Sequence, residues 1–415
     1  MKVQSSVRAR LCGVAFLMAL AAGCGGGGGG GEPGPGAPAA PPAGPPVGPP
    51  AVPEVRGWSK PFGSASVVLG QSVFDGFDPE GGAATPIYFP QGRPAVTSEG
   101  HLLVTESGNY ALVFGDYEAM NGPVADGRFE IRDRIGVYDL STSGAKLIVA
   151  SAFTVSILNS APTGGVADPD VFAGDGSSGC SASQLEEVTA AALTPDGRRL
   201  IVADTDNHRV LIWNDVDQAT GALGAADVVL GQEGMNTCEA NADGSPDSGT
   251  LSQPRSVWSD GLRLIVSDAG NNRLLVWNDI TNITDFQAAD VVIGQQDDSE
   301  AEPNRGQGAP SGISLSGPRG VDVSALGELA VADTGNNRVL IWRAIPNTAD
   351  KQADLVVGQS DFTHGAANDP GQTGQHGTTL SAKTLSMPEG VRFHGRNLIV
   401  NDHGNHRVLV WRESD

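Results

Sequence analysis

Acidic and basic side chains recur together at four places in this chain. The stretch "ADTGNNRVLIW" (332–342) returns in similar form as "ADTDNHRVLIW" (203–213), "SDAGNNRLLVW" (267–277) and "NDHGNHRVLVW" (401–411). Such carboxylates and guanidiniums could contact a ligand, or they could stabilise a turn. Gly335 can take a positive φ, Asn tolerates one, and an Asp oxygen can accept hydrogen bonds from turn amides, which favours the structural role.

We therefore expect each Asp to hydrogen-bond its own turn or to pair with the Arg that follows it, with ligand binding as the alternative. The residues concerned are Asp204, Arg209, Asp268, Arg273, Asp333, Arg338, Asp402 and Arg407. Degenerate copies occur earlier, in 102–114 with Glu106 in the Asp position, and in 147–158 with no acid.

Other residue types give little support for catalysis. The seven histidines include no HExxH or other close metal pattern, and no GxSxG, Walker or Rossmann motif occurs. His208 and His406 share one turn position in different repeats, so we do not expect them to share a metal. We predict no catalytic residue and no metal ligand set.

An acidic cluster and two cysteines lie between the repeats. Asp297, Asp298, Glu300 and Glu302 could hold a divalent cation such as calcium, but they lack the regular oxygen spacing of a calcium loop, which favours solvated acidity. Cys180 and Cys238 lie in two long connections, and a disulfide needs α-carbons within about 7 Å. We expect a bond only if both connections lean inward or depart from the symmetry of the repeats.

Short β-branched segments dominate the chain after Trp58. Each repeat supplies four of them, separated by Gly, Asn, Asp and Pro, as in "PRGV", "LAVAD", "RVLIW" and "ADLVVGQ". Six such units are present, and four-stranded units repeated radially form the blades of a β-propeller. We expect the tryptophans at 213, 277, 342 and 411 to fill the gaps between blades.

The two ends of the repeat region complement each other. The last unit stops after its third strand, and "SVVLGQ" (66–71) matches the missing fourth strand. We predict that it pairs with residues 408–411 and closes the ring, which removes an open sheet edge. The expected fold is all-β: a six-bladed β-propeller of four-stranded antiparallel blades over residues 58–415.

The repeated Asp–Asn–Arg–Trp motif resembles the NHL repeat, which is named for an Asn-His-Leu stretch. The copy "DNHRVLIW" (206–213) comes close to that stretch. The resemblance covers about 350 residues, and NHL domains form six-bladed propellers. The family includes protein-binding and RNA-binding scaffolds and a peptide-amidating lyase, so it is a weak guide to function. The lyase places zinc in the central channel through histidines, and no equivalent set is evident here.

The N-terminus has the pattern of an export signal. Lys2, Arg8 and Arg10 precede an apolar stretch too short to span a bilayer, and the run ends in "LAAGC" (20–24). This resembles the lipobox of bacterial lipoproteins, although Ala21 stands where Leu is more usual. We expect residues 1–23 to be a signal peptide and Cys24 to be lipidated; ordinary secretion with a free Cys24 is the alternative.

A tether is expected to follow Cys24. Residues 24–57 contain seven consecutive glycines and a Pro-rich tract, which together give a flexible and then semi-stiff spacer without a core. By the same lipoprotein resemblance, Gly25 favours the outer membrane in a host that has one. We expect a propeller on the cell envelope, facing the periplasm or the surface.

Charge limits the partners. The chain has 26 basic and 48 acidic residues, and removal of three basic residues with the signal leaves 23 against 48, a formal charge of −25. Nucleic acid is therefore a poor partner. We expect a monomer that binds an unidentified protein, glycan or small ligand through its rim of long loops. The alternatives are a metal-assisted hydrolase or lyase with a site at the channel mouth, and a spacer without a ligand.

Overall fold

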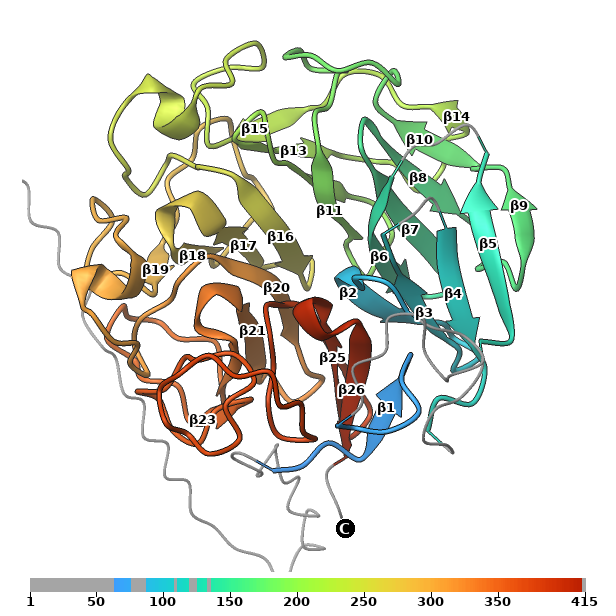
Figure 1. The fold of residues 1–415 in the computed structure, drawn as a ribbon. Coiled ribbons are helices and arrows are strands. Elements are labelled where there is room, and N and C mark those ends of the chain that lie inside the picture. The colour runs from blue at the N-terminus through green and yellow to red at the C-terminus, as the bar shows by residue number, and fades with distance from the viewer. Residues whose placement is uncertain (1–62, 76–86, 108–109, 119–124, 133–135, 413–415) are drawn as a thin grey trace, which may run out of the picture. The chain divides into compact units, whose positions relative to one another are not determined.

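The computed structural model describes residues 63–75, 87–107, 110–118, 125–132 and 136–412. The predicted signal peptide (1–23) and the predicted tether with Cys24 (24–57) lie outside the described residues. Six sheets follow one another around a ring (Figure 1), so the prediction of an all-β, six-bladed propeller is confirmed. None of the helices in the described ranges is long and apolar enough to cross a membrane.

The first three blades follow chain order, each beginning at the innermost strand. Blade 1 contains β2 (Gln91–Val96), β3 (Leu102–Thr105), β4 (Tyr110–Phe114), β5 (Gly127–Ile131) and β9 (Gly165–Ala167). Blade 2 contains β6 (Val137–Ser143), β7 (Lys146–Ser151), β8 (Thr154–Leu158), β10 (Val171–Ala173) and β14 (Gly221–Ala222). Blade 3 contains β11 (Val188–Leu193), β12 (Leu200–Asp204), β13 (Arg209–Trp213) and β15 (Val228–Leu230).

The other three blades have four strands each. Blade 4 contains β16 (Pro254–Ser259), β17 (Leu264–Asp268), β18 (Arg273–Trp277) and β19 (Val291–Ile293). Blade 5 contains β20 (Pro318–Val323), β21 (Leu329–Asp333), β22 (Arg338–Trp342) and β23 (Leu355–Val357). Blade 6 contains β24 (Pro388–His394), β25 (Asn397–Asp402), β26 (Arg407–Arg412) and, from the start of the propeller, β1 (Val67–Leu69).

Five short 3-10 helices lie in turns and connections. They are η1 (Ala240–Asp243), η2 (Ala269–Asn271), η3 (Pro303–Gly306), η4 (Thr334–Asn336) and η5 (His403–Asn405). The turns between the second and third strands of blades 4, 5 and 6 are η2, η4 and η5.

The ends of the described region meet in blade 6. Strand β1 pairs antiparallel with β26, with Val67 opposite Val410, and the two strands lie side by side in Figure 1. This is the pairing expected between residues 66–71 and 408–411. The indole N–H of Trp411 also donates to the carbonyl oxygen of Gly63 at 2.9 Å.

Two blades contain an outer strand that the repeat pattern does not predict. Strand β9 leaves blade 2 to pair parallel with β5 of blade 1, and β14 leaves blade 3 to pair parallel with β10 of blade 2. Each added strand covers the edge of the preceding blade, which removes a free row of backbone donors and acceptors. The additions also tie blades 1, 2 and 3 together.

The core consists of six apolar clusters, each between two neighbouring blades. Each blade is covered on both faces, so its strands are continuous apolar runs instead of alternating ones. The repeated tryptophans lie in four of these clusters, as predicted. Their indole N–H groups donate at 2.8–2.9 Å to carbonyl oxygens of Gly224, Gln287, Lys351 and Gly63.

Candidate functional site

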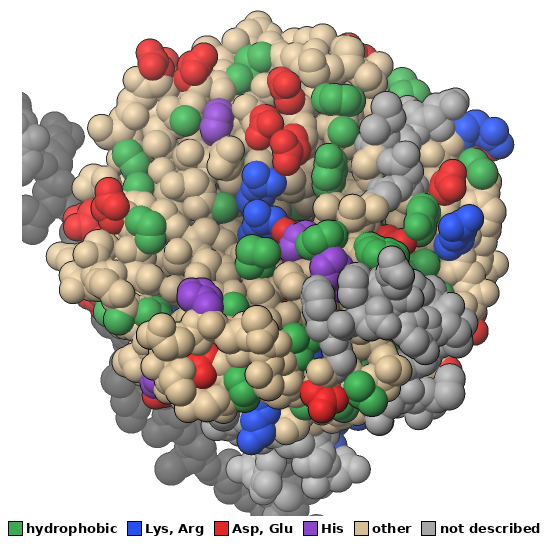
Figure 2. Space-filling view, viewed as in Figure 1, with side chains coloured by type: hydrophobic (Ala, Val, Ile, Leu, Met, Phe, Trp, Pro, Cys, Tyr) green, Lys and Arg blue, Asp and Glu red, His purple; other side chains and the backbone are tan. Residues whose placement is uncertain are grey.

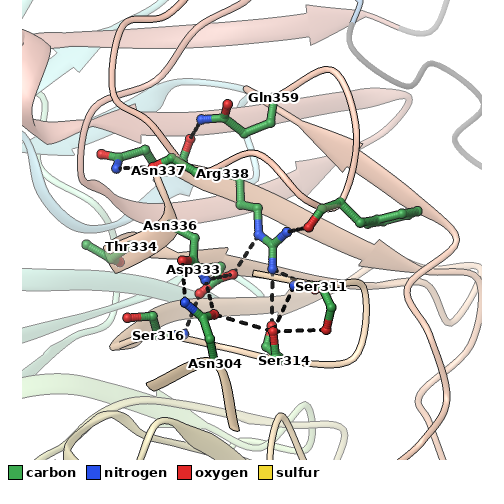
Figure 3. A network of polar contacts seen from close by, with 12 residues as sticks. Asn304, Ser311, Ser314, Ser316, Asp333, Thr334, Asn336, Asn337, Arg338 and Gln359 are labelled. Carbon is green, nitrogen blue, oxygen red and sulfur yellow. Dashed lines mark hydrogen bonds and ion pairs between the residues drawn. The ribbon is translucent and has the colours of Figure 1, made fainter. Parts of the chain in front are cut away.

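The repeated Asp organises the turn after each second strand. In blade 5, Oδ1 of Asp333 accepts the backbone N–H of Ser316 at 2.7 Å, and Oδ2 accepts from Asn336 at 2.8 Å and from Nε of Arg338 at 2.7 Å (Figure 3). Both side chains of the ion pair are fully buried. Blades 3, 4 and 6 repeat the Asp–Arg pair at 2.7–2.8 Å.

The Arg of each pair joins the loops on either side of its blade. Arg338 donates to the carbonyl oxygens of Ser311 and Ser314, before the blade, and to that of Phe362, after it. The equivalent Arg273 binds Asp247 and Thr250 on one side and Asp298 on the other. The long connections therefore lie on the same rim as the Asp turns, and each is held by a buried guanidinium.

Burial shifts the pKa of the repeated Asp carboxyl groups. Desolvation raises the pKa of Asp204 to about 6 and also raises the pKa of Asp268 and Asp402, while the paired Arg and the turn amides oppose the rise. No face of these pairs is open to a ligand, because the side chains are fully buried. The four pairs position the rim and are not themselves a binding surface.

Neighbouring blades are linked by the residue just before the Arg. In blades 4 and 5 it is Asn, and Oδ1 of Asn272 and Asn337 accepts the backbone N–H of Gly317 and Met387 in the next blade, at 2.7 and 2.9 Å. In blades 3 and 6 it is His, and Nδ1 of His208 and His406 accepts from Gln253 and Phe89, at 3.0 and 3.2 Å. Asn and His can therefore replace each other at the position before the Arg, because both side chains accept the same backbone hydrogen bond.

The prediction for Gly335 was wrong in detail. The residue with positive φ in that turn is Asn337 (φ 52), two positions later. Gly335 is required for space, since a Cβ atom there would lie 2.5 Å from Oγ and 2.8 Å from the carbonyl oxygen of Ser316.

The degenerate first repeat retains half of the arrangement. Glu106 is buried and accepts the backbone N–H of Tyr88 at 2.9 Å, in the manner of the repeated Asp. Tyr110 lies opposite it in place of the Arg, and a hydrogen bond to Glu106 is the largest cause that raises the pKa of Tyr110.

The two propeller cysteines form a disulfide. Cys180 and Cys238 have α-carbons 6.2 Å apart. Cys180 lies between β10 and β11, and Cys238 between β15 and β16, so the bond joins two consecutive rim connections.

The innermost strands carry a feature that the repeats do not reveal. The pairing of the first two strands skips one residue of the inner strand in blades 2, 3, 4 and 6, two residues in blade 5, and three residues in blade 1. Bulges turn side chains away from the regular sheet faces. Five unpaired residues of blades 2 to 6, together with Gln91, which pairs with Thr105 just before the irregularity of blade 1, line one cavity of about 260 Å³ at the channel mouth. These six half-buried side chains are the mouth ring: Gln91, Tyr138, Thr189, Arg255, Arg319 and Glu389.

Glycines allow the inner strands to meet closely below the mouth ring. A Cβ atom on Gly390 would lie 1.7 Å from the carbonyl oxygen of Gly92, and one on Gly320 would lie 2.6 Å from that of Glu389. The repeated "PxGV" thus has a structural Gly and a variable residue before it, and that variable residue belongs to the mouth ring.

Arg93 closes the channel beneath the mouth ring. Its guanidinium donates to Asp139 at 2.9 Å and crosses to the carbonyl oxygens of Ala191 in blade 3 and Val257 in blade 4, at 3.0 and 2.7 Å. Both charged side chains are almost fully buried. No repeat position predicts this Arg, because it lies within the irregular stretch of blade 1.

Charges of both signs lie in and beside the mouth ring. Arg255 lies 3.2 Å from Glu187, and Arg319 forms an ion pair with Glu389, which is 3.6 Å from Nδ1 of His403. Figure 2 shows basic side chains next to histidine at the centre of this face. Burial raises the pKa of Glu187, and a hydrogen bond with Asp206 adds to the rise.

Apolar side chains are exposed beside the mouth ring. Tyr88, Phe89 and Met387 are 37%, 40% and 47% exposed. The ring of Phe89 lies 3.9 Å, centroid to centroid, from that of His406 and 5.1 Å from that of His403. Phe89 and Met387 precede their inner strands with φ of 45° and 47°, so the backbone itself directs these side chains.

The predicted acidic cluster lies on a rim connection. Asp297 accepts from the N–H and hydroxyl of Ser299, and the carbonyl oxygens of Asp298 and Glu302 accept from Arg273 and Gln295. Within the described ranges, no group of three or more His, Cys, Asp or Glu side chains could hold a metal ion.

Comparison with known proteins supports the repeat. Residues 315–342 match the family model of the NHL repeat. This match contains the first three strands of blade 5 and one complete Asp–Arg turn. No match is found among curated proteins.

Two solved structures are similar in outline. The WD40 β-propeller domain of Doa1 is 12% identical, with 78% of this chain and 79% of that chain covered and a TM-score of 0.42. The computationally designed Ika8 protein is 9% identical, with 78% and 70% covered and a TM-score of 0.38.

Proposed function

We propose that this protein is a lipid-anchored scaffold outside the cytoplasm that binds a partner protein at the mouth ring. The observation that carries the proposal is the mouth ring itself. Its six positions carry five different residue types, with Arg in both blade 4 and blade 5, on a framework that otherwise repeats, and all six side chains are half-buried around one cavity. The stability of the propeller does not require different residues at this position, whereas the recognition of one specific partner does.

The composition of this face favours a protein partner. Tyr and Arg are enriched among the residues that dominate the binding energy of protein interfaces, especially around a partly desolvated centre. The mouth ring supplies Tyr138, Arg255 and Arg319, and Phe89 and Met387 supply apolar contact area next to it. A formal charge of −22 disfavours nucleic acid.

The anchor follows from the N-terminal sequence. Lipidation of Cys24 and the tether over 24–57 would hold the propeller near a membrane, and Gly25 favours the outer membrane. Metabolic labelling with a radioactive fatty acid tests this part: we expect label on the wild-type chain and none on Cys24→Ser. Label on the variant would contradict the anchor while leaving the binding proposal intact.

Site-specific crosslinking tests the binding face. A photoreactive amino acid is placed at Met387, beside the mouth ring, or at Leu326, which is 50% exposed in the turn between β20 and β21 at the other end of blade 5. In native cell envelopes we expect one discrete crosslinked protein from position 387 and not from position 326. The same product from both positions, or none from 387, would contradict the proposal.

A further inference from the structure

A second cavity lies at the opposite end of the channel from the mouth ring. It has a volume of about 510 Å³ and is lined by the ends of β6, β11, β16, β20 and β24 with the turns that follow them. Arg93 lines both cavities, so its guanidinium is the partition between them. A ligand in one cavity is therefore separated from the other by a buried ion pair.

The side chains at this end also vary at one structural register. Five residues pair with the residue that follows the first leucine of the neighbouring strand in their respective blades, and we call them the lower ring: Ser141, Ala192, Trp258, Asp322 and Arg392. All five line the cavity. The strand pairing is the same in these five blades, whereas the lower-ring side chain differs in each.

Trp258 differs from the repeated tryptophans. Those four donate their indole N–H to loop carbonyls, whereas the indole N–H of Trp258 has no acceptor within the described part of the chain. Trp258 is half-buried, and so is Phe393, which lines the same cavity. They supply aromatic surface from blades 4 and 6, on either side of blade 5, and the Trp258 indole adds one free donor. The Arg263 guanidinium lies over the Trp258 ring, 5.9 Å from its centroid.

The polar wall is built from Asp322 and Arg392. The Asp322 carboxylate is 2% exposed, accepts the backbone N–H of Phe393 at 2.7 Å, and lies 3.3 Å from Nη1 of Arg392. Nε of Arg392 is buried without a protein partner among the described residues. Burial raises the pKa of Asp322, and Arg392 and Arg93 oppose the rise.

These features define the chemistry of an occupant. The unused indole N–H of Trp258 and the Asp322 carboxylate line the same cavity as two aromatic side chains, and Asp322 and Arg392 compensate each other in charge. A hydroxyl group can donate to a carboxylate and accept from an N–H at once, while the C–H face of a sugar ring packs on aromatic carbon. We propose that the lower ring binds a neutral saccharide of one or two sugar rings.

Saturation-transfer NMR on the full-length chain tests this proposal. The detergent must have no sugar head group, and the probes are glucose, galactose, N-acetylglucosamine and maltose at millimolar concentrations. We expect transfer to at least one of them and none with Trp258→Ala. Trp258→Phe keeps a ring but removes the N–H, and should weaken binding up to about tenfold.

Two controls separate the possible failures. Leu262→Ala removes an exposed side chain at the same end of blade 4 that does not line the cavity, and it should leave the signal unchanged. The mouth-ring variant Arg319→Gln/Glu389→Gln should also leave it unchanged, even if that variant loses a protein partner. No transfer to any of the four sugars, or equal transfer with Trp258→Ala, would overturn the saccharide site.

Discussion

The guanidinium of Arg93 in blade 1 donates a 2.7 Å hydrogen bond to the carbonyl oxygen of Val257 in blade 4, across the centre of the ring. The same group pairs with Asp139 in blade 2. Because this buried side chain of blade 1 bonds to blades 2, 3 and 4 and lines both cavities, it lies between them at the centre of the ring. Arg93 therefore both stabilises the propeller and lies between its two cavities.

Loss of Arg93 should therefore be costly. Arg93→Ala leaves the Asp139 carboxylate buried without its partner, and we expect the free energy of unfolding to fall by about 3–5 kcal/mol. Urea denaturation measures it. The exposed Arg132–Asp168 pair, 56% and 68% exposed, is the control, since Arg132→Ala should cost less than about 1 kcal/mol. An equal loss of unfolding free energy in the two variants would show that the buried Arg93–Asp139 pair contributes no more to stability than an exposed pair.

Gly335 should not tolerate a side chain despite its ordinary φ. Gly335→Ala would press a methyl group against Ser316, 2.5 Å from its Oγ, and we expect a loss of about 1–3 kcal/mol. Gly224→Ala is the matched control, because nothing lies within 4 Å of a Cβ atom there. Thermal melting of both variants distinguishes them. A Gly335→Ala protein as stable as Gly224→Ala would refute the steric explanation.

Two blade junctions should weaken in acid. Burial lowers the pKa of His208 and His406 below the ordinary 6.5, and each uses Nδ1 as an acceptor. The native state thus binds protons less tightly than the unfolded chain, so this stability is complete above pH 6.5 and is lost as the pH falls.

Asparagine supplies the test of that pH dependence, because Asn272 and Asn337 accept the same bond in blades 4 and 5. His208→Asn/His406→Asn should show a shallower fall in unfolding free energy between about pH 7.5 and pH 5 than the wild type, since Asn does not titrate in this range. Parallel curves for the two proteins would rule out these histidines as the cause.

The disulfide should stabilise the rim. Cys180 and Cys238 are 58 residues apart in sequence, and closure of a loop of that size restricts the unfolded chain by up to about 4 kcal/mol. We expect Cys180→Ser/Cys238→Ser to lower the free energy of unfolding toward that limit. Alkylation of the unreduced, denatured wild type should find no free thiol at either position, and two free thiols would disprove the bond.

Repetition made much of this fold predictable. The number of blades, the Asp–Arg turns and the inter-blade tryptophans all follow from residues that recur in register, because the same local structure is required in each blade. Strands β9 and β14 could not be predicted, since "GVA" and "GA" are too short to show a pattern and depend on pairing with another blade.

The candidate site was missed for the opposite reason. Arg255, Arg319 and Glu389 stand at one position of a repeated phrase, and the significance of that position becomes visible only once the bulges place it at the channel mouth. Arg93 gives no sequence signal, because it belongs to the irregular first strand of blade 1. The long rim loops, which composition favoured as the binding surface, are held by buried arginines and surround the mouth ring.

The affinity of the crosslinked partner for mouth-ring variants tests the central claim most directly. Arg319→Gln/Glu389→Gln removes both members of an ion pair, so no unpaired charge remains and the melting temperature should change little. We predict at least a tenfold loss of affinity, equivalent to about 1.4 kcal/mol, with the fold intact. An unchanged affinity in a folded variant would contradict the assignment of the mouth ring as the binding site.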